Sequence, residues 1–353
     1  MKKSTKNILI SSGVAATTMA IMAGTAFSAS KYLMKVALDR ELPKSSDKSK
    51  ARLTGSAKLV EFSSDIDKFA AEFEEREGIE QVEITAPDGV TLVGHLYECP
   101  EAKRIIVAMH GWRSSWSRDF GMISDFWHNN GCSVLYAEQR GQNNSGGDYM
   151  GFGMLERHDC LEWVKWVNER TGASLPIYLA GVSMGAATVL MASELELPEN
   201  VHGIMADCGF TSPHAIWKHV AEKNLHLSYG IIGKIADDMC KKKINMGAND
   251  CSTIHALQNT NIPVAFVHGS DDKFVPIEMT YENYKACVAP KRLLVVPGAE
   301  HGMSYYTDKS LYEEYVLDFW KDFDSVKPVP VKKDEKSNDE LSRTELSKDE
   351  IPE

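Results

Sequence analysis

The fold is decided by residues 177–187, which read Ile-Tyr-Leu-Ala-Gly-Val-Ser-Met-Gly-Ala-Ala. The apolar residues at the start of this stretch predict a buried strand, and the small residues at its end predict a helix packed closely against a sheet. Between them, Gly181 and Gly185 flank Ser183 in a G-x-S-x-G pattern, which is typical of a sharp turn from strand to helix. Such a turn exposes the serine hydroxyl at a helix N-terminus, where backbone N–H groups face developing negative charge. Ser183 is therefore the candidate nucleophile.

Apolar runs follow one another along the chain, separated by segments with helical periodicity. Runs without polar alternation that are separated by helices are typical of a parallel sheet covered on both faces. Before them, alternating segments at residues 82–85 and 91–97 are joined by Pro87-Asp88-Gly89, which predicts a β-hairpin. We therefore predict an α/β fold with one mostly parallel, mixed sheet and helices on both faces. The predicted parallel strands are residues 104–109, 133–137, 177–180, 203–206, 264–267 and 292–296.

The main domain is predicted over residues 58–324, with one interruption of the strand–helix alternation. Residues 211–261 carry a helical pattern and no strand-like run. They form either a short helical lid over the carboxyl edge of the sheet or a longer crossover connection, and both interpretations stay open. Residues 325–353 are rich in Lys, Glu, Asp, Ser and Pro, which predicts a disordered charged tail.

The first 30 residues are predicted to lie outside the folded domain. Lys2, Lys3 and Lys6 precede an apolar, small-residue stretch at residues 8–27. This pattern indicates a cleaved signal peptide or an uncleaved signal-anchor that spans the membrane, and we favour the anchor. In both cases the basic flank leaves the catalytic domain outside the cell membrane, either anchored to it or secreted. Residues 31–57 are predicted to be a juxtamembrane linker.

Composition narrows the function. The net charge of −11 argues against a nucleic-acid binder, since such a protein presents a basic face. The seven cysteines are scattered, mostly within apolar runs, and are predicted to be buried free thiols. The sequence contains neither a C-x-x-C nor an H-E-x-x-H pattern, so we predict no metal site and no cofactor.

A serine nucleophile needs a base and an acid that orients the base. His301 follows the strand-like run at residues 292–296 and is the candidate base, whereas His110 and His268 each precede a glycine and are expected to serve turns. Asp272 follows the run at residues 264–267 and is the candidate acid, with Asp271 as its rival. The chain order Ser, Asp, His is the order found on α/β-hydrolase folds.

The oxyanion hole is predicted from two backbone N–H groups. The loop after residues 104–109 reads His-Gly-Trp-Arg-Ser-Ser, and its Trp112 N–H is expected to point at the substrate carbonyl together with the Met184 N–H. Three tryptophans, by contrast, have two open interpretations, because they line either an apolar acyl pocket or the core. They are Trp116, Trp127 and Trp217.

Five ordered motifs resemble the α/β-hydrolase superfamily, in the branch of bacterial serine hydrolases similar to BEM46-like and serine-aminopeptidase-like proteins. The motifs are His-Gly-Trp at 110–112, Glu-Gln-Arg-Gly-Gln-Asn-Asn-Ser at 138–145, Gly-Val-Ser-Met-Gly at 181–185, His-Gly-Ser-Asp-Asp-Lys-Phe-Val-Pro at 268–276, and Ala-Glu-His at 299–301. The family pattern H-G-x-x-D-x-x-V-P implies that Asp272 is the acid. Glu138 departs from the family, which usually has Asp there, in a loop that the resemblance implies to be structural.

The resemblance implies the α/β-hydrolase fold and a carboxylesterase-like serine hydrolase that needs no cofactor. We expect a small-molecule or peptide acyl substrate, cleaved through an acyl-enzyme on Ser183 with His301 and Asp272 in support. A peptidase or amidase of the same fold is the alternative among enzymes. A non-catalytic envelope protein is the alternative outside enzymes, although all three triad positions are filled.

Overall fold

The computed structural model describes residue 24 and residues 27–42 and 62–325. Most of the predicted signal or anchor, the predicted linker from residue 43 on, and the tail from residue 326 on lie outside these residues. Within the described ranges, no helix is both long enough and apolar enough to cross a bilayer.

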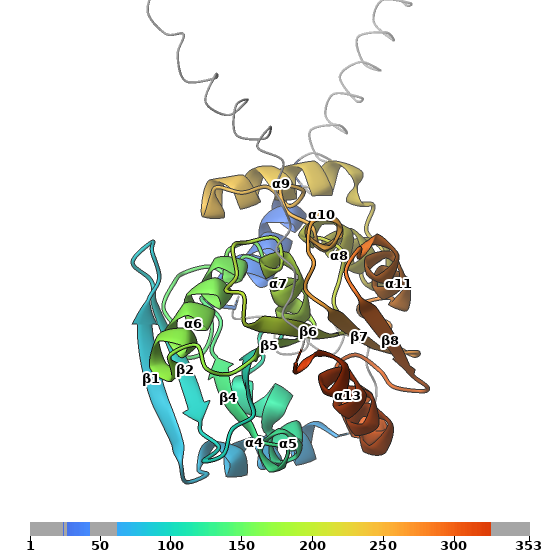
Figure 1. Cartoon of the computed structure of the whole chain (residues 1–353). Coiled ribbons are helices and arrows are strands. Elements are labelled where there is room, and N and C mark those ends of the chain that lie inside the picture. The colour runs from blue at the N-terminus through green and yellow to red at the C-terminus, as the bar shows by residue number, and fades with distance from the viewer. Residues whose placement is uncertain (1–23, 25–26, 43–61, 326–353) are drawn as a thin grey trace, which may run out of the picture.

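Eight strands of the described chain form one sheet in the order β1-β2-β4-β3-β5-β6-β7-β8. Strands β3 to β8 run parallel, and β2 is antiparallel to both β1 and β4. This arrangement confirms the predicted mostly parallel, mixed sheet (Figure 1). The strands are β1 Ile79–Thr85, β2 Thr91–Tyr97, β3 Arg104–Met109, β4 Cys132–Ala137, β5 Ile177–Val182, β6 Val201–Asp207, β7 Val264–Gly269 and β8 Lys291–Val296.

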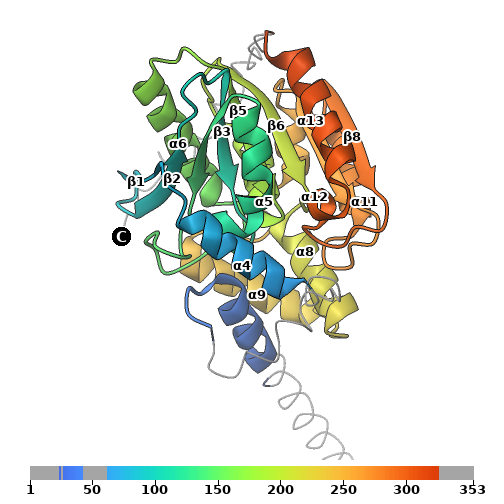
Figure 2. The ribbon, with the colours of Figure 1, turned by 90° about the horizontal axis from the view of Figure 1, so that it is seen from below.

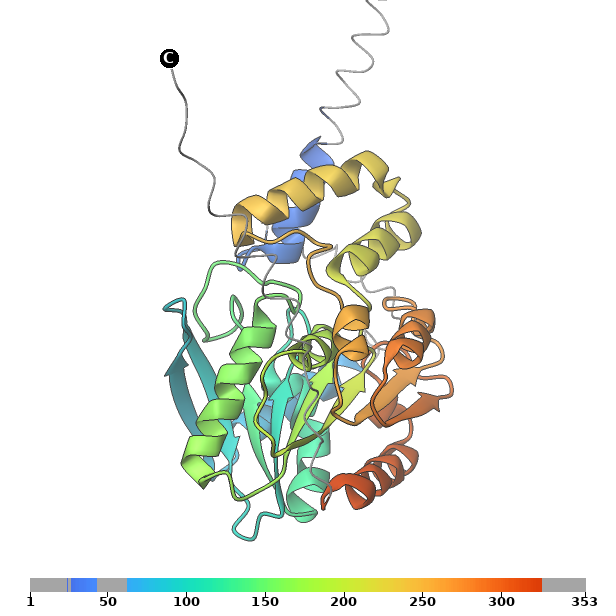
Figure 3. The same ribbon diagram turned by 45° about the horizontal axis from the view of Figure 1, so that its top comes forward.

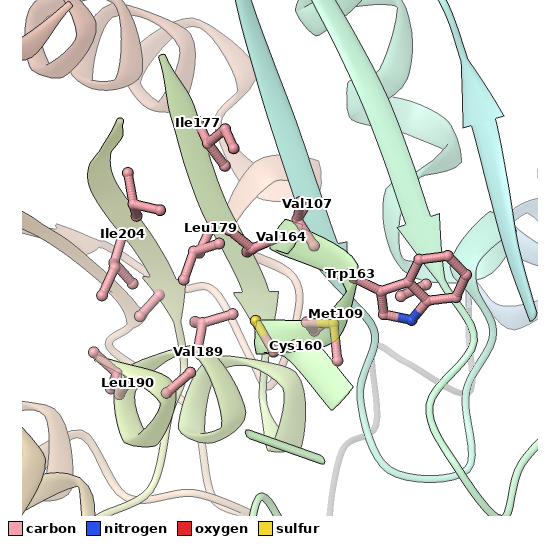
Figure 4. Packing of buried hydrophobic residues seen from close by; sticks show 14 of the residues in the cluster. Val107, Met109, Cys160, Trp163, Val164, Ile177, Leu179, Val189, Leu190 and Ile204 are labelled. Carbon is pink, nitrogen blue, oxygen red and sulfur yellow. The ribbon is translucent and has the colours of Figure 1, made fainter. Parts of the chain in front are cut away.

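Helices cover both faces of the sheet, which explains why the parallel strands are apolar without alternation. Successive residues of one strand enter different cores: Val107 and Met109 belong to one cluster, and Ile106 and Ala108 belong to the other. Figure 4 shows the first cluster, where Leu179 of β5 lies near Val189 of the helix α7. Helices on that face are α6 Glu156–Thr171, α7 Met184–Ala192, α10 Thr253–Gln258 and α11 Ile277–Ala286.

The opposite face carries α5 and α13, with α4 packed against α5 (Figure 2). Phe73 of α4, Phe120 of α5 and Phe319 of α13 are all fully buried in the second cluster. A short helix, α12, leads from the loop after β8 into α13. The bounds are α4 Ser63–Glu74, α5 Trp116–Asn129, α12 Ser304–Thr307 and α13 Lys309–Phe323.

A third apolar cluster lies over the carboxyl ends of the strands. It joins residues that come soon after the ends of β5, β6 and β7, such as Met184, Phe210 and Val275, to helices above them. These upper helices are α8 Pro213–His219, the π-helix η1 Val220–Asn224 and α9 Tyr229–Ile244. These helices belong to residues 211–261, the segment predicted to be a lid or a crossover, and they cover the ends of the strands. The remaining helix of that segment, α10, packs against α7 and α11 in the body of the domain.

The predicted linker differs from the structure in its first part. Residues 27–38 form a helix that lies beside α9 (Figures 1 and 3), where Ser30 Oγ donates to the Ile232 carbonyl at 3.3 Å. Met34 and Leu38, four residues apart on one helix face, are buried in the third cluster. This apolar spacing places residues 31–38 in the fold, although the charged residues around them resemble a linker.

The seven cysteines are all free, and six of them are buried. This confirms the prediction of buried thiols. Burial raises the pKa of Cys132 to about 11 and that of Cys160 to about 12, so both stay protonated thiols near neutral pH.

Candidate active site

Ser183 lies at the tight turn between β5 and α7. Its φ of 55° is in the left-handed region, a conformation that costs on the order of 1–3 kcal/mol for a residue with a side chain. The flanking glycines make the turn sterically possible. A Cβ on Gly181 would lie 2.3 Å from the Gly185 carbonyl, and a Cβ on Gly185 would lie 1.8 Å from the Met109 oxygen. The sequence therefore holds the serine hydroxyl in one strained, fixed position.

Ser183, His301 and Asp272 form a continuous hydrogen-bonded relay. His301 Nε2 lies 2.8 Å from Ser183 Oγ, and His301 Nδ1 lies 2.7 Å from Asp272 Oδ2. The three residues follow β5, β8 and β7 respectively, so they meet because parallel strands end at the same edge of the sheet. This geometry is that of a nucleophile, a base and an acid that orients the base.

Asp272 is held as a carboxylate. Its Oδ1 accepts hydrogen bonds from the Phe274 and Val275 N–H groups, both at 2.9 Å. Burial alone would raise the pKa of Asp272, but the charge of His301 and hydrogen bonds with His268 and His301 outweigh burial and hold the pKa well below its usual range. Asp271, the rival acid, is instead exposed and accepts from Ser270 Oγ at 2.7 Å.

Opposing effects act on the imidazole of His301. Burial lowers its pKa, but the negative charge of Asp272 and the hydrogen bond to it outweigh burial, and Asp207 and Asp119 add further negative charge. The net result is a pKa above the ordinary value of 6.5. A base with a raised pKa accepts the serine proton more readily once it is neutral.

The loop of Gly111 and Trp112 passes next to the nucleophile. A Cβ on Gly111 would lie 3.5 Å from Ser183 Cβ, and the Gly111 N–H donates to Asp119 Oδ2 at 2.6 Å. Met184 follows Ser183 directly and opens α7, so its N–H is at a helix N-terminus. The role of the Trp112 and Met184 N–H groups as oxyanion donors stays a prediction that this placement supports.

The two other strand-end histidines have structural partners. His110 bonds the Gly111 oxygen through Nδ1 at 2.8 Å, and its Nε2 accepts from the Gln139 N–H at 3.1 Å. His268 Nε2 lies 2.9 Å from the Val275 oxygen and 3.3 Å from Asp272 Oδ2. His268 thus does more than serve a turn, because it also contacts the Asp272 carboxylate.

Sequence reasoning missed Asp207. This residue ends β6, is buried, and accepts a hydrogen bond from Ser304 Oγ at 2.9 Å. Burial raises its pKa to about 6, so above that pH it adds negative charge near His301. Because Ser304 follows the His301 loop, this bond also ties that loop to β6. The available signal was a carboxylate directly after an apolar run, and Asp272 was identified from a similar position, in the loop after such a run.

The contacts of Glu138 explain why this position differs from the family pattern, which usually has Asp there. Its Oε1 lies 2.7 Å from His95 Nε2 on β2 and 3.0 Å from Asn144 Nδ2. The longer side chain reaches across to the antiparallel part of the sheet and holds the loop after β4. The residue is therefore structural, as the resemblance implies.

Among the described residues, Cys208, Asp272 and His301 are the one group of three or more metal-ligating side chains whose donor atoms all lie within 4.8 Å of one another. Two of these three residues already bond each other in the relay. Burial raises the pKa of the Cys208 thiol well above its usual value, so the thiolate that binds metals well is disfavoured. These donors fit the hydrogen-bonded relay better than a metal centre.

An apolar cavity of about 70 Å³ lies beside the relay, between the carboxyl ends of the strands and the upper helices. Two of its lining residues adjoin the site: Phe274, whose ring centroid lies 4.9 Å from that of His301, and Trp112, which belongs to the loop that passes beside Ser183. Of the three tryptophans with open interpretations, Trp217 lines the cavity, whereas Trp116 and Trp127 belong to the core on the far face. The aromatic lining consists of Trp112, Phe152, Trp217, Tyr229 and Phe274.

Comparison with known proteins gives one family and one fold. Residues 118–324 match the prolyl oligopeptidase family, Peptidase_S9. The protein YqkD of Bacillus subtilis is 28% identical over 193 residues, a match that spans 54% of this chain and 62% of YqkD.

Solved structures with this fold include an esterase and a peptidase. The esterase Pf2001 of Pyrococcus furiosus superposes with a TM-score of 0.58 at 21% identity, over 70% of this chain and 92% of that protein. The acylaminoacyl peptidase of Pyrococcus horikoshii superposes with a TM-score of 0.53 at 14% identity, over 74% of this chain and 44% of that protein. At these identities the likeness is one of fold.

Proposed function

We propose that this chain, a serine hydrolase that belongs to the prolyl oligopeptidase family, cleaves carboxylic esters through an acyl-enzyme on Ser183. The observation that carries the proposal is the relay of 2.8 Å and 2.7 Å hydrogen bonds from Ser183 through His301 to Asp272. A serine constrained by a strained turn and bonded to a buried, oriented imidazole is arranged to be an activated nucleophile.

The reaction uses each group at a stated atom. Ser183 Oγ attacks the ester carbonyl carbon while its proton moves to His301 Nε2, and Asp272 stabilises the imidazolium through Nδ1–H. The carbonyl oxygen becomes an oxyanion that accepts hydrogen bonds from the Trp112 and Met184 N–H groups. The alcohol leaves with the proton from His301. Water then attacks the acyl-enzyme by the same route, which releases the acid and restores Ser183.

Two observations support an ester over a peptide bond. The cavity beside the relay is lined by apolar side chains, which suits a hydrocarbon acyl group. The chain also aligns with 92% of the Pyrococcus furiosus esterase but with 44% of the acylaminoacyl peptidase, so more than half of that peptidase has no counterpart in the alignment. Peptidase activity is the second candidate, and the family match favours it.

The test uses the full chain, because residues 27–42 pack into the body and a shortened protein would lose them. We would treat the protein and Ser183→Ala with a fluorophosphonate probe and measure covalent labelling by intact mass. We expect one label on the parent and none on the variant. Both proteins would then be given p-nitrophenyl hexanoate and hexanoyl p-nitroanilide, which share an acyl group. We expect turnover of the ester by the parent, and faster turnover of the anilide would assign the peptidase function instead.

A further inference from the structure

The helix of residues 27–38 forms one wall of the apolar cavity. Leu33, Met34, Val36 and Ala37 contribute to the lining, and Met34 is only 2% exposed. The facing walls come from α8, η1 and α9 and from Trp112 and Phe274 at the relay. Two segments that are distant in the sequence therefore enclose the cavity. One is the insertion between β6 and β7, and the other is the helix of residues 27–38, which precedes β1.

The same helix is bonded to the predicted oxyanion loop. The Trp112 indole N–H donates to the Ala37 carbonyl at 2.9 Å. The Arg113 guanidinium donates to the carbonyls of Val36 at 2.8 Å and 3.1 Å, of Asp39 at 2.5 Å and of Arg40 at 3.1 Å. A cation on the free carbonyls at a helix C-terminus is electrostatically favourable. The helix is thus fixed to the loop that passes beside Ser183.

We propose that the helix of residues 27–38 is part of the substrate site, and that Met34 determines the length of the acyl chain that the enzyme accepts. This proposal rests on the proposed function, since it names the acyl group of that same ester. The ligand class is a short to medium, unbranched hydrocarbon acyl group. The cavity volume of about 70 Å³ and its apolar lining suit a chain of this kind better than a bulky or polar group.

The test alters Met34 in the full chain in both directions and measures kcat/KM for p-nitrophenyl esters from two to twelve carbons. Met34→Ala removes three heavy atoms from the wall, so we expect the preferred acyl chain to lengthen by about two to three carbons. The kcat/KM ratio of the octanoyl ester to the butanoyl ester should rise about tenfold or more. Met34→Phe should instead shorten the preferred chain.

Leu38→Ala is the matched control. Leu38 is on the same helix and fully buried, but it is not part of the cavity lining. We expect this variant to change all esters by a similar factor and to leave the chain-length preference in place. If Met34→Ala also leaves the preference in place while the parent is active, or if Leu38→Ala shifts it equally, the proposed role of Met34 is wrong.

A binding measurement separates this proposal from the proposed function. In Ser183→Ala, methyl ketones of graded chain length would be titrated while tryptophan fluorescence is followed, because Trp112 and Trp217 line the cavity. We expect the affinity to rise with chain length up to the longest chain that the cavity holds. When Met34→Ala is added to Ser183→Ala, this longest chain should become longer. If the ketones bind in this way but the parent turns over no ester, the proposed function is wrong and the cavity is still a binding site for hydrocarbon chains. If the parent turns over esters but ketone binding does not depend on chain length, the proposed function stands and the proposed role of the cavity is wrong.

Discussion

The floor and the roof of this active site are built in different ways. The floor comprises Ser183, Asp272, His301 and the loop of Trp112, all on loops at strand ends, and its relay consists of short side-chain hydrogen bonds. The roof comprises residues 27–38, α8, η1 and α9, and it is held mainly by apolar packing in the third cluster. Under the proposed function, the floor would carry out the chemistry, where a displacement of 1 Å is costly, and the roof would determine which acyl group fits.

The difference has a practical consequence for substitutions. A change in the floor removes an interaction that the transition state needs and should lower turnover of every substrate. A change in the roof alters the walls of a cavity and should affect substrates unequally. Substitutions in each region, each compared with a control at a neighbouring residue, therefore test whether the floor affects all substrates alike and the roof affects them unequally.

The largest effect is expected at the acid of the floor. Asp272→Asn removes the carboxylate that orients His301, so we expect kcat to fall by about 10⁴-fold for every ester. Asp271→Asn changes an exposed side chain and should stay within a few-fold of the parent. Both variants would be assayed with the same p-nitrophenyl ester, after circular dichroism shows that each is folded. A severe loss in Asp271→Asn together with a mild one in Asp272→Asn would reassign the acid.

The floor could be predicted from the sequence because its parts are local. Each candidate residue lies in the loop after an apolar run, and parallel strands bring their carboxyl ends together whatever the details of packing. Ser183 is further marked by two glycines that the turn requires. Asp207 was missed although it is at a strand end, and His268 was given only the role of serving a turn, because their bonds to Ser304 and Asp272 depend on how the loops fold back.

The roof could not be predicted in the same way, since it depends on contacts between distant parts of the chain. Charged residues such as Lys35 and Arg40 make the start of the predicted linker, residues 31–57, resemble a linker, and only the spacing of Met34 and Leu38 indicates a buried helix face. The carbonyls of this helix are bound by Arg113, more than 70 residues away in sequence. Local patterns do not indicate such a partner.

A medium effect is expected at the bond between roof and floor. Arg113→Met removes the donors to the carbonyls of Val36, Asp39 and Arg40, so the helix should loosen. Burial lowers the pKa of this guanidinium to about 10 although the negative charge of Asp39 opposes the shift, so Arg113 is still charged near neutral pH but has a desolvation cost. We expect faster hydrogen exchange in residues 27–38 and a loss of about tenfold in kcat/KM for the hexanoyl ester.

Arg118→Met is the matched control for the roof. Arg118 of α5 pairs with Asp67 of α4 in a partly exposed ion pair. Exposed pairs of this kind contribute about 0–1 kcal/mol, so activity and exchange in residues 27–38 should stay near the parent values. Equal exchange in the two variants would show that Arg113 does not hold the helix.

The smallest effect is expected in the pH dependence of the floor. His301 must be neutral to accept the serine proton, so kcat/KM should rise with pH through the pKa of His301. The carboxylates of Asp272, Asp207 and Asp119 hold that pKa above 6.5 against the effect of burial, so the midpoint should also lie above 6.5. A flat profile across this range would remove His301 from the role of base.

Asp207→Asn sharpens this prediction, because it removes one of these negative charges while an amide oxygen can still accept the Ser304 hydroxyl. The imidazolium of His301 is then less stabilised, its pKa falls, and the midpoint of the profile should move to lower pH by less than one unit. Asp271→Asn, which changes an exposed carboxylate, should leave the midpoint in place. If the midpoint does not move in Asp207→Asn, the charge of Asp207 does not act on His301, and Asp207 contributes only through its hydrogen bond to Ser304. Ser304→Ala, which removes that bond, should then lower kcat.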